Sequence, residues 1–173
     1  MLVRSPTPND RDGLMALLAL RHDEFGLGTF DPRRAERTLQ LAIDGTAPVI
    51  VGVIGGEGTP EATIGLALAQ WWDTSDQHLE AMWDYVHPDW RTTDHPRKLD
   101  QFAQIVADRF GVPLIMGGPI RAGHEGKVRS YCKRFQPIGA FFLYGGPGGT
   151  RPTKKQREAS AANLIQAFGG GAK

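Results

Sequence analysis

Three basic side chains near a short polar stretch have the types and spacing needed to bind a phosphate group. Arg91, Arg97 and Lys98 bracket the segment 92–95. A guanidinium donates paired hydrogen bonds to phosphate oxygens and an ammonium adds a point charge, so the set is suited to a pyrophosphate. A few surface cations beside a turn are equally common in α/β proteins that bind nothing there, so a purely structural role stays open.

This polar stretch follows a predicted strand. Side chains alternate in type over residues 79–86, and this period of two indicates a strand with two distinct faces. Pro88 cannot donate to a strand ladder, so the strand ends at His87-Pro88. One face carries Leu79, Ala81, Trp83 and Tyr85, and the other carries Glu80, Met82, Asp84 and Val86.

A long amphipathic helix is predicted after the stretch, with Pro96 in its first turn and Asp94 or His95 as its cap. Gly111 and Pro113 end it. A loop that enters a helix N-terminus gathers unpaired N–H groups and the positive end of the helix dipole, which favours a phosphate there. The inner face is expected to carry Leu99, Phe102, Ala103, Val106 and Phe110, and the outer face Arg97, Lys98, Asp100, Gln104 and Asp108.

Two segments resemble motifs of the GNAT superfamily of N-acyltransferases. Residues 86–91, Val-His-Pro-Asp-Trp-Arg, are similar to the V-x-P-x-x-R-like turn of the family's acetyl-coenzyme-A-binding segment, and the helix that follows also fits. Residues 127–135 resemble the family's last helix, which has a tyrosine a few residues before a phenylalanine. The resemblance covers about residues 1–145, and its pattern is closest to phage-encoded members.

The resemblance implies an α/β fold with a mixed, mostly antiparallel central sheet and helices on both faces. In the family two parallel strands splay apart and the pantetheine arm of acetyl-coenzyme A passes through the gap, near Tyr85 and Val86 in this chain. The family's phosphate loop is R/Q-x-x-G-x-G/A, whereas this chain has Arg91-Thr92-Thr93-Asp94-His95-Pro96 and lacks both glycines. Positively charged side chains must then replace the phosphate contacts that a glycine-containing backbone would make. We expect Arg91, Arg97 and Lys98 to bind the pyrophosphate with the amides of Thr92, Thr93, Asp94 and His95, Arg91 contributing most.

Glu80 and Tyr131 are the candidate catalytic residues that the resemblance implies. Acyl transfer to an amine needs a base for the amine proton and an acid for the leaving thiolate. Glu80 matches a glutamate that some GNAT enzymes use as a base through water, and Asp84 is expected on the same strand face. Tyr131 matches the family's tyrosine acid. The alternatives are that Glu80 and Asp84 simply face solvent and that Tyr131 packs in the core.

Other reactive residue types form no compelling set. Trp71 and Trp72 could wall an acceptor pocket, although core or sheet-face packing is the commoner role. Cys132 is the single cysteine and has no histidine at a spacing that predicts an acyl-cysteine. The histidines are scattered, so no metal site is expected, and His95 in the turn is the one to test.

The order of predicted elements suits one domain over residues 1–145. Helices are predicted from Thr7 and from Asp31-Pro32, strands over 48–54 and 62–72 joined by a glycine-rich hairpin loop, a buried parallel strand over 112–116 and a last strand over 140–144. The remainder, 146–173, begins as a glycine-rich linker and continues as a basic tail able to form a short helix. We expect truncation at Gly145 to preserve the fold and to remove any partner complex.

Composition excludes several classes of function. The net charge is +1 and no segment has a signal-peptide core or an apolar run of membrane length, so a membrane role is not expected and the cytoplasm is the default location. For a phage-encoded protein, the location would be the host cytoplasm or the virion. A single cysteine fits a reducing compartment.

Three functions remain in contention. The first is transfer of an acetyl group from acetyl-CoA to an unidentified amine, on a small molecule or a protein. The second is a catalytically inactive GNAT-fold assembly protein, of a phage particle for example, that docks a partner or a second copy through residues 146–173. Nucleic-acid binding through the basic tail is the weakest, because a few cations give only a modest, salt-sensitive attraction.

Overall fold

The computed structural model describes residues 2–26, 28–46, 48–117 and 125–136. The chain divides into two compact units, one of residues 1–26 and 30–121 and a smaller one of residues 27–29 and 122–173. The expected domain boundary after residue 145 and the expected strand over 140–144 lie outside the described residues. Among those residues no helix is long and apolar enough to cross a bilayer.

The larger unit is built on a four-stranded sheet in the order β1-β2-β3-β4. Strand β1 (Val49–Gly56) pairs antiparallel with β2 (Thr59–Gln70), which pairs antiparallel with β3 (Gln77–Val86). Strand β4 (Leu114–Ile115) runs parallel to β3. The predicted hairpin, central strand and parallel strand are therefore confirmed.

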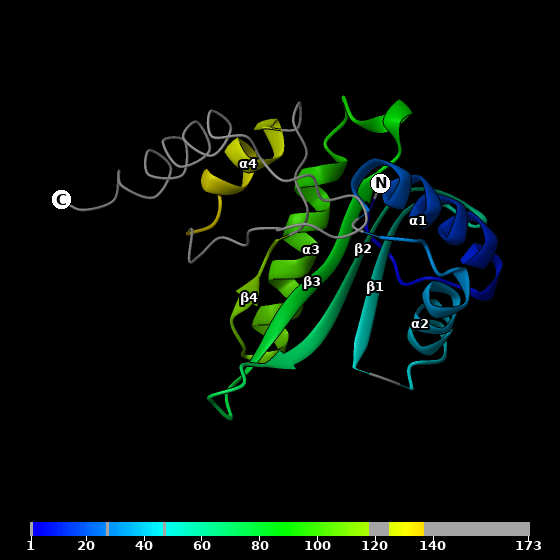
Figure 1. Cartoon of the computed structure of the whole chain (residues 1–173). Helices are drawn as coiled ribbons and strands as arrows, with labels where there is room; N and C mark the ends of the chain where they lie inside the picture. The colour runs from blue at the N-terminus through cyan, green and yellow to red at the C-terminus, as the bar shows by residue number, and fades with distance from the viewer. Residues whose placement is uncertain (1, 27, 47, 118–124, 137–173) are drawn as a thin grey trace. The chain divides into compact units, whose positions relative to one another are not determined.

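Helices cover both faces of this sheet (Figure 1). Helices α1 (Arg11–Phe25) and α2 (Pro32–Asp44) pack on one face, where Leu14, Leu18 and Leu39 meet Val51, Val53 and Trp83. Helix α3 (His95–Phe110) packs on the other face, where Leu99 and Ala103 meet Ile64, Leu66 and Leu79. The mixed sheet with helices on both faces, expected from the GNAT resemblance, is confirmed.

A β-bulge in β3 changes which way its side chains face. Gly65 pairs with Trp83 and Leu66 with Ala81, so Met82 has no partner on β2. Leu79 and Ala81 therefore pack on the α3 side, whereas Trp83 packs on the α1–α2 side. The expectation of one continuous face from Leu79 to Tyr85 was wrong, because one extra residue in a strand inverts the alternation after it.

Residues Pro8–Asp10 form a 3-10 turn, η1, that anchors the N-terminal segment to the β1–β2 hairpin. The carboxylate of Asp10 is buried and accepts bidentate hydrogen bonds from Arg4, at 2.6 and 2.8 Å. It also accepts from the amides of Thr7 at 2.7 Å and Gly58 at 2.9 Å. Arg4 also forms an isolated antiparallel bridge with Val53 of β1.

Helix α3 follows the predicted boundaries and ends at Gly111, whose φ of 66° is the left-handed conformation that glycine adopts readily. Two of its side chains are not where periodicity placed them. Phe110 is 48% exposed in the last turn, and Asp100 is buried although the outer face was expected. Asp100 is buried because the helix covers the sheet with a wider face than five positions define, whereas Phe110 is the last residue of the helix and remains half-exposed.

Of the smaller unit, the structure describes residues 28–29 and 125–136, which include helix α4 (Glu125–Cys132). Tyr131 is half-buried, and its ring meets Phe135 edge-on with centroids 5.8 Å apart. The ammonium of Lys127 lies 5.6 Å from the centre of the Tyr131 ring. The helix predicted over this segment is confirmed.

Candidate functional site

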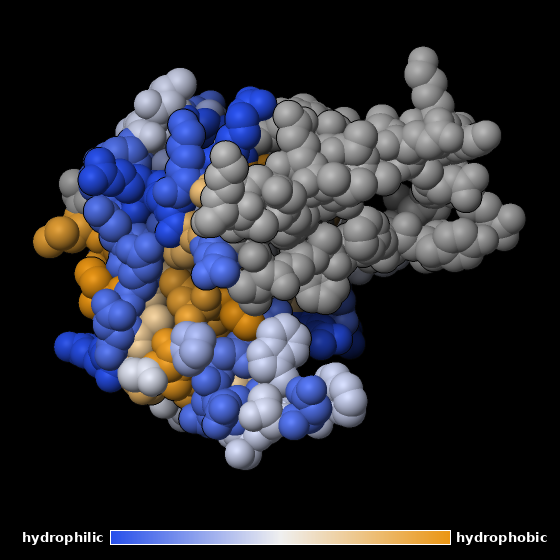
Figure 2. Space-filling view, turned by 90° about the vertical axis from the view of Figure 1, so that its left-hand side faces the viewer, coloured by the Kyte–Doolittle hydropathy of each residue, from blue (hydrophilic) through white to orange (hydrophobic). Residues whose placement is uncertain are grey.

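The sheet opens between β3 and β4. Their parallel pairing covers only two positions, Leu79 with Leu114 and Glu80 with Ile115. Strand β3 continues to Val86 with no partner on that side within the described part of the chain. The side of the molecule with β4 and α3 has an apolar area in its middle, bordered by hydrophilic residues (Figure 2). Among the described residues, β3 beyond Glu80 therefore has no strand partner on this side.

The segment between β3 and α3 is tightly folded by its own hydrogen bonds. Residues Pro88–Trp90 form a second 3-10 turn, η2, and the amide of Trp90 donates to the carbonyl of His87 at 2.9 Å. The hydroxyl of Thr93 donates to the carbonyl of Trp90 at 2.6 Å, and the same carbonyl accepts from the Thr93 amide at 3.1 Å. The amide of His95 donates to the Thr93 hydroxyl at 3.3 Å. Two of the four amides that were expected to meet phosphate, those of Thr93 and His95, are therefore used within the loop.

Two amides at the start of α3 remain available. The N-cap residue Asp94 makes no side-chain cap hydrogen bond. The amides of Thr92 and Arg97 have no hydrogen-bond partner within the described residues. Uncapped amides at the positive end of a helix dipole favour an anion.

Arg91 folds back onto the protein. Its guanidinium pairs with the carboxylate of Glu24 in the last turn of α1, and its Nε donates to the carbonyl of Val86 at 3.3 Å. The hydroxyl of Tyr85 donates to Glu24 at 3.0 Å and lies 3.3 Å from Arg91. Burial raises the pKa of Tyr85, and the hydrogen bond to the Glu24 carboxylate raises that pKa further. The hydrogen bond to Glu24 likewise raises the pKa of Arg91.

The other two predicted cations differ from each other. The ammonium of Lys98 lies 2.8 Å from the carboxylate of Asp94 one turn earlier, and this hydrogen bond lowers the pKa of Asp94. Arg97 is exposed and has no ion pair within the described residues. Of the three predicted phosphate-binding cations, Arg97 is therefore the one that forms no ion pair with a carboxylate of the described residues.

His95 is buried where α3 begins. Its Nε2 lies 2.7 Å from a carboxylate oxygen of Glu61 on β2, and its ring stacks on Trp90 with centroids 5.7 Å apart and planes at 8°. Its Nδ1 is buried without a hydrogen-bond partner in the described part of the chain. The histidine of the turn is thus an anchor between strand and helix.

Glu80 and Asp84 lie on opposite faces of the sheet. Glu80 alternates with Leu79 and Ala81, which pack toward α3, so its exposed side chain is on the other side. Asp84 comes after the bulge and pairs with Ile64, a residue of the α3 side. The expectation that the two carboxylates share a face was wrong, because the bulge at Met82 inverts the alternation of side chains between Glu80 and Asp84.

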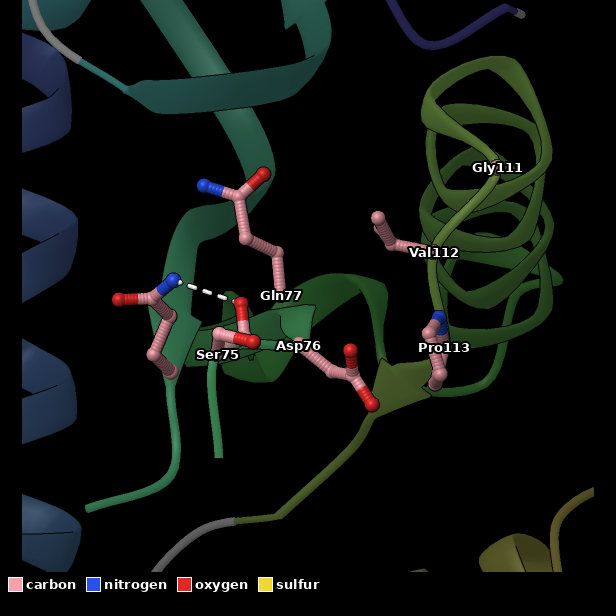
Figure 3. A pocket seen from close by; sticks show the side chains of 7 residues that line it. Ser75, Asp76, Gln77, Gly111, Val112 and Pro113 are labelled. Atoms are coloured by element: carbon pink, nitrogen blue, oxygen red, sulfur yellow. Dashed lines mark hydrogen bonds between the residues drawn. The ribbon is translucent and has the colours of Figure 1, made fainter. Parts of the chain in front are cut away.

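The aromatic pair at the end of β2 is on the surface. Trp72 is 94% exposed, and Trp71 is 46% exposed and stacks on His78 with centroids 5.0 Å apart. A shallow hollow lies at this end of the sheet, between the β2–β3 connection and the residues that follow α3 (Figure 3). Within it the side-chain amide of Gln70 donates through Nε2 to the main-chain carbonyl of Ser75 at 2.9 Å. Neither tryptophan belongs to its described lining, which consists of Gln70, Ser75, Asp76, Gln77, Gly111, Val112 and Pro113.

Cys132 is exposed at the end of α4. No group of three or more histidine, cysteine, aspartate or glutamate side chains suited to a metal ion occurs in the described residues. The sequence reasoning missed Glu24 and Glu61, the two carboxylates that hold the loop. A glutamate near a helix end and another in a strand carry no local signal of a partner tens of residues away.

Known structures of acetyltransferases share this fold. A predicted acetyltransferase from Clostridium acetobutylicum, solved with acetyl-CoA, matches with a TM-score of 0.64 and 11% identity, over 83% of this chain and 94% of that one. The ribosomal-protein-alanine N-acetyltransferase of Brucella melitensis biovar Abortus 2308 matches with a TM-score of 0.63 and 15% identity, over 84% and 100%. An aminoglycoside acetyltransferase from an uncultured soil metagenomic sample, in complex with trehalose, matches with 0.62 and 12%, over 84% and 95%.

No protein-family model and no curated protein matches the sequence. At such low identities, the likeness to solved structures establishes the fold and does not extend to the activity.

Proposed function

We propose that this protein is an N-acetyltransferase that transfers the acetyl group of acetyl-CoA to an amine. The observation that supports this most is the short parallel pairing of β3 with β4, which ends at Glu80 and leaves the rest of β3 without a partner on that side among the described residues. The structural neighbours are acetyltransferases, and one was solved with acetyl-CoA. The same architecture in this chain supports the same co-substrate.

The residues around the opening fit the parts of acetyl-CoA. The amides of Thr92 and Arg97 and the Arg97 guanidinium, which have no partner in the described part of the chain, provide donors for a pyrophosphate near the positive end of α3. Tyr85 and Val86, at the open end of β3, border the path of the pantetheine arm. Arg91 and Lys98 add positive charge at the ends of the loop even though each is paired with a carboxylate.

Two side chains carry the proposed proton transfers. Bound acetyl-CoA supplies the activated acetyl thioester. Glu80, exposed on β3 next to the opening, takes the proton of the acceptor ammonium through water. Tyr131 returns a proton to the thiolate, for which a phenol of pKa about 10 is suitable. An amide N–H of β3 near Val86 stabilises the oxyanion.

The acceptor is proposed to be a primary amine. Structural neighbours include a ribosomal-protein-alanine N-acetyltransferase and an aminoglycoside acetyltransferase, and both names indicate amine acceptors. The proposal covers an amine of a protein and an amine of a small molecule, because one fold can serve different substrate classes.

One observation favours an inactive binding protein as a second candidate. Two of the three predicted phosphate-binding cations, Arg91 and Lys98, are already paired with Glu24 and Asp94. We expect a protein that has lost co-substrate binding to have such a loop, without glycines and with two of its positive charges neutralised.

Titration with coenzyme A and acetyl-CoA separates the two candidates. A ligand at 100 times its dissociation constant stabilises the folded protein by ~2.7 kcal/mol, which a thermal shift detects. Binding of both ligands, followed by release of free thiol in the presence of an amine panel, supports the acetyltransferase. Absence of any shift at millimolar ligand contradicts it and favours the binding protein.

A further inference from the structure

Both ends of the β3–α3 loop are attached to one residue of β2, Glu61. The main-chain carbonyl of Glu61 accepts from the amide of His87, where the loop begins, at 2.9 Å. Its side-chain carboxylate lies 2.7 Å from Nε2 of His95, where the loop ends. A single residue of the neighbouring strand therefore closes the loop at both ends.

The side-chain contact is sheltered from solvent. The His95 side chain is 7% exposed and that of Glu61 is 19% exposed. An ionised carboxylate can only accept, so Nε2 carries the hydrogen and the orientation of the ring is set by Glu61. The stacked Trp90 ring covers the histidine, and Trp90 in turn is bonded to Thr93 through its carbonyl. A series of contacts therefore connects Glu61, through His95 and Trp90, to Thr93 in the middle of the loop.

We propose that Glu61 is a positioning residue for the phosphate-binding loop, acting through His95 and Trp90. This inference rests on the proposed function. A loop without glycines cannot adapt its backbone freely to a phosphate, so its donors must be placed in advance. Held between Glu61 and its own hydrogen bonds, the loop keeps the amides of Thr92 and Arg97 free at the start of α3.

A bare structural role of the Glu61–His95 pair predicts a different result. A pair that only stabilises the fold would, when broken, lower the melting temperature and leave ligand preference unchanged. A positioning role affects the part of the ligand that meets the loop and spares the part that lies along β3. Coenzyme A carries both parts, whereas pantetheine lacks the pyrophosphate.

The experiment measures the binding of coenzyme A and of pantetheine to the full chain by calorimetry. The variants are Glu61→Ala, which removes the carboxylate, and Glu61→Gln, which keeps a hydrogen-bond acceptor for His95. The matched control is Glu36→Ala, which breaks the ion pair of Glu36 with Arg11 between α2 and α1. His95→Gln, which keeps a donor toward Glu61 but loses the ring, is used if Glu61→Ala does not fold.

Glu61→Ala is expected to weaken coenzyme A binding by about tenfold and to leave pantetheine binding unchanged, while Glu61→Gln stays close to the parent. His95→Gln is expected to weaken coenzyme A binding in the same selective way. Equal loss for both ligands, or an unchanged affinity for coenzyme A, overturns the positioning role and leaves the proposed function standing. A parent protein that binds no coenzyme A overturns both.

Discussion

Arg91 is bound to Glu24, a residue 67 positions earlier in the chain. The guanidinium therefore connects the loop after β3 to the end of α1. The Tyr85 hydroxyl joins the same group, because it donates to Glu24 and accepts from Arg91. This pairing changes how the cations around the loop rank as phosphate ligands. The sequence alone favours Arg91, whereas the structure leaves Arg97 without an acidic partner among the described residues.

The first prediction follows from this difference. Arg97→Ala should weaken coenzyme A binding by roughly tenfold without changing the melting temperature, because its charge pairs with no carboxylate of the described residues and is available to a ligand. Arg91→Ala should lower the melting temperature, because Glu24 and Tyr85 lose their partner. Calorimetry and thermal unfolding on both variants test the pair. Comparable loss of affinity with unchanged stability in Arg91→Ala would restore Arg91 as a direct ligand.

The sequence predicted the elements of this fold better than the contacts between them. The position of the central strand, the helix start at Asp31-Pro32 and the stop at Gly111 are local signals, and each was confirmed. The bulge at Met82 carries no such signal, since a strand with one extra residue has the same alternating letters. It reversed the faces of every later residue of β3.

Within the candidate site the sequence identified the loop and not what holds it. Arg91, His95 and Lys98 were singled out by type and position. Their carboxylate partners could be foreseen only for Lys98, whose partner Asp94 lies one helical turn away. Glu24 and Glu61 come from α1 and β2, and such long-range pairs are determined by the packing of the whole sheet.

The second prediction concerns the close contact between Gly65 and Trp83. A Cβ atom added at Gly65 would lie 2.4 Å from the Trp83 ring, whose indole N–H donates to the Thr63 hydroxyl at 3.4 Å. Gly65→Ala should therefore destabilise the fold by about 1–3 kcal/mol. Gly126→Ala is the control, because a Cβ there meets no atom of the described residues within 4 Å and alanine favours a helix. Chemical denaturation of both variants should show opposite signs, and an unchanged Gly65→Ala midpoint would mean that the indole moves freely.

The third prediction concerns pH. The hydrogen bonds from Arg4 and the amides of Thr7 and Gly58 hold the pKa of Asp10 well below its usual range. The unfolded chain protonates this carboxyl at about pH 3.9, so its stabilisation is fully present above that pH and is lost as the pH falls toward the folded pKa.

Asp10→Asn should accordingly lower stability by roughly 2–3 kcal/mol at neutral pH and flatten the acid limb of the stability curve. Asp12→Asn, an exposed substitution two residues away, is the control. Urea unfolding between pH 2 and pH 7 makes the comparison. A parallel offset of the variant at every pH would show that Asp10 is not the group that titrates.

The fourth prediction tests Glu80 as the base. Glu80→Gln should lower kcat by about 10²–10⁴-fold and remove the acidic limb of its pH profile, while the KM for acetyl-CoA stays near the parent value. Asp84→Asn is the matched control, because Asp84 is a carboxylate of the same strand that lies on the opposite face. Equal loss of activity in the two variants would indicate a general charge effect on β3, with no specific role for Glu80.

The last prediction concerns the hydroxyl of Tyr131. Its ring contacts the ammonium of Lys127 and the ring of Phe135, and Tyr131→Phe keeps both contacts while it removes only the hydroxyl. If that hydroxyl protonates the leaving thiolate, the variant should bind coenzyme A as the parent does and turn over about 10²–10⁴-fold more slowly. Steady-state rates of thiol release with any accepted amine, combined with calorimetry, measure the two effects separately. An unchanged rate in Tyr131→Phe would assign the tyrosine to packing, and a combined loss of binding and rate would place its hydroxyl in the co-substrate site.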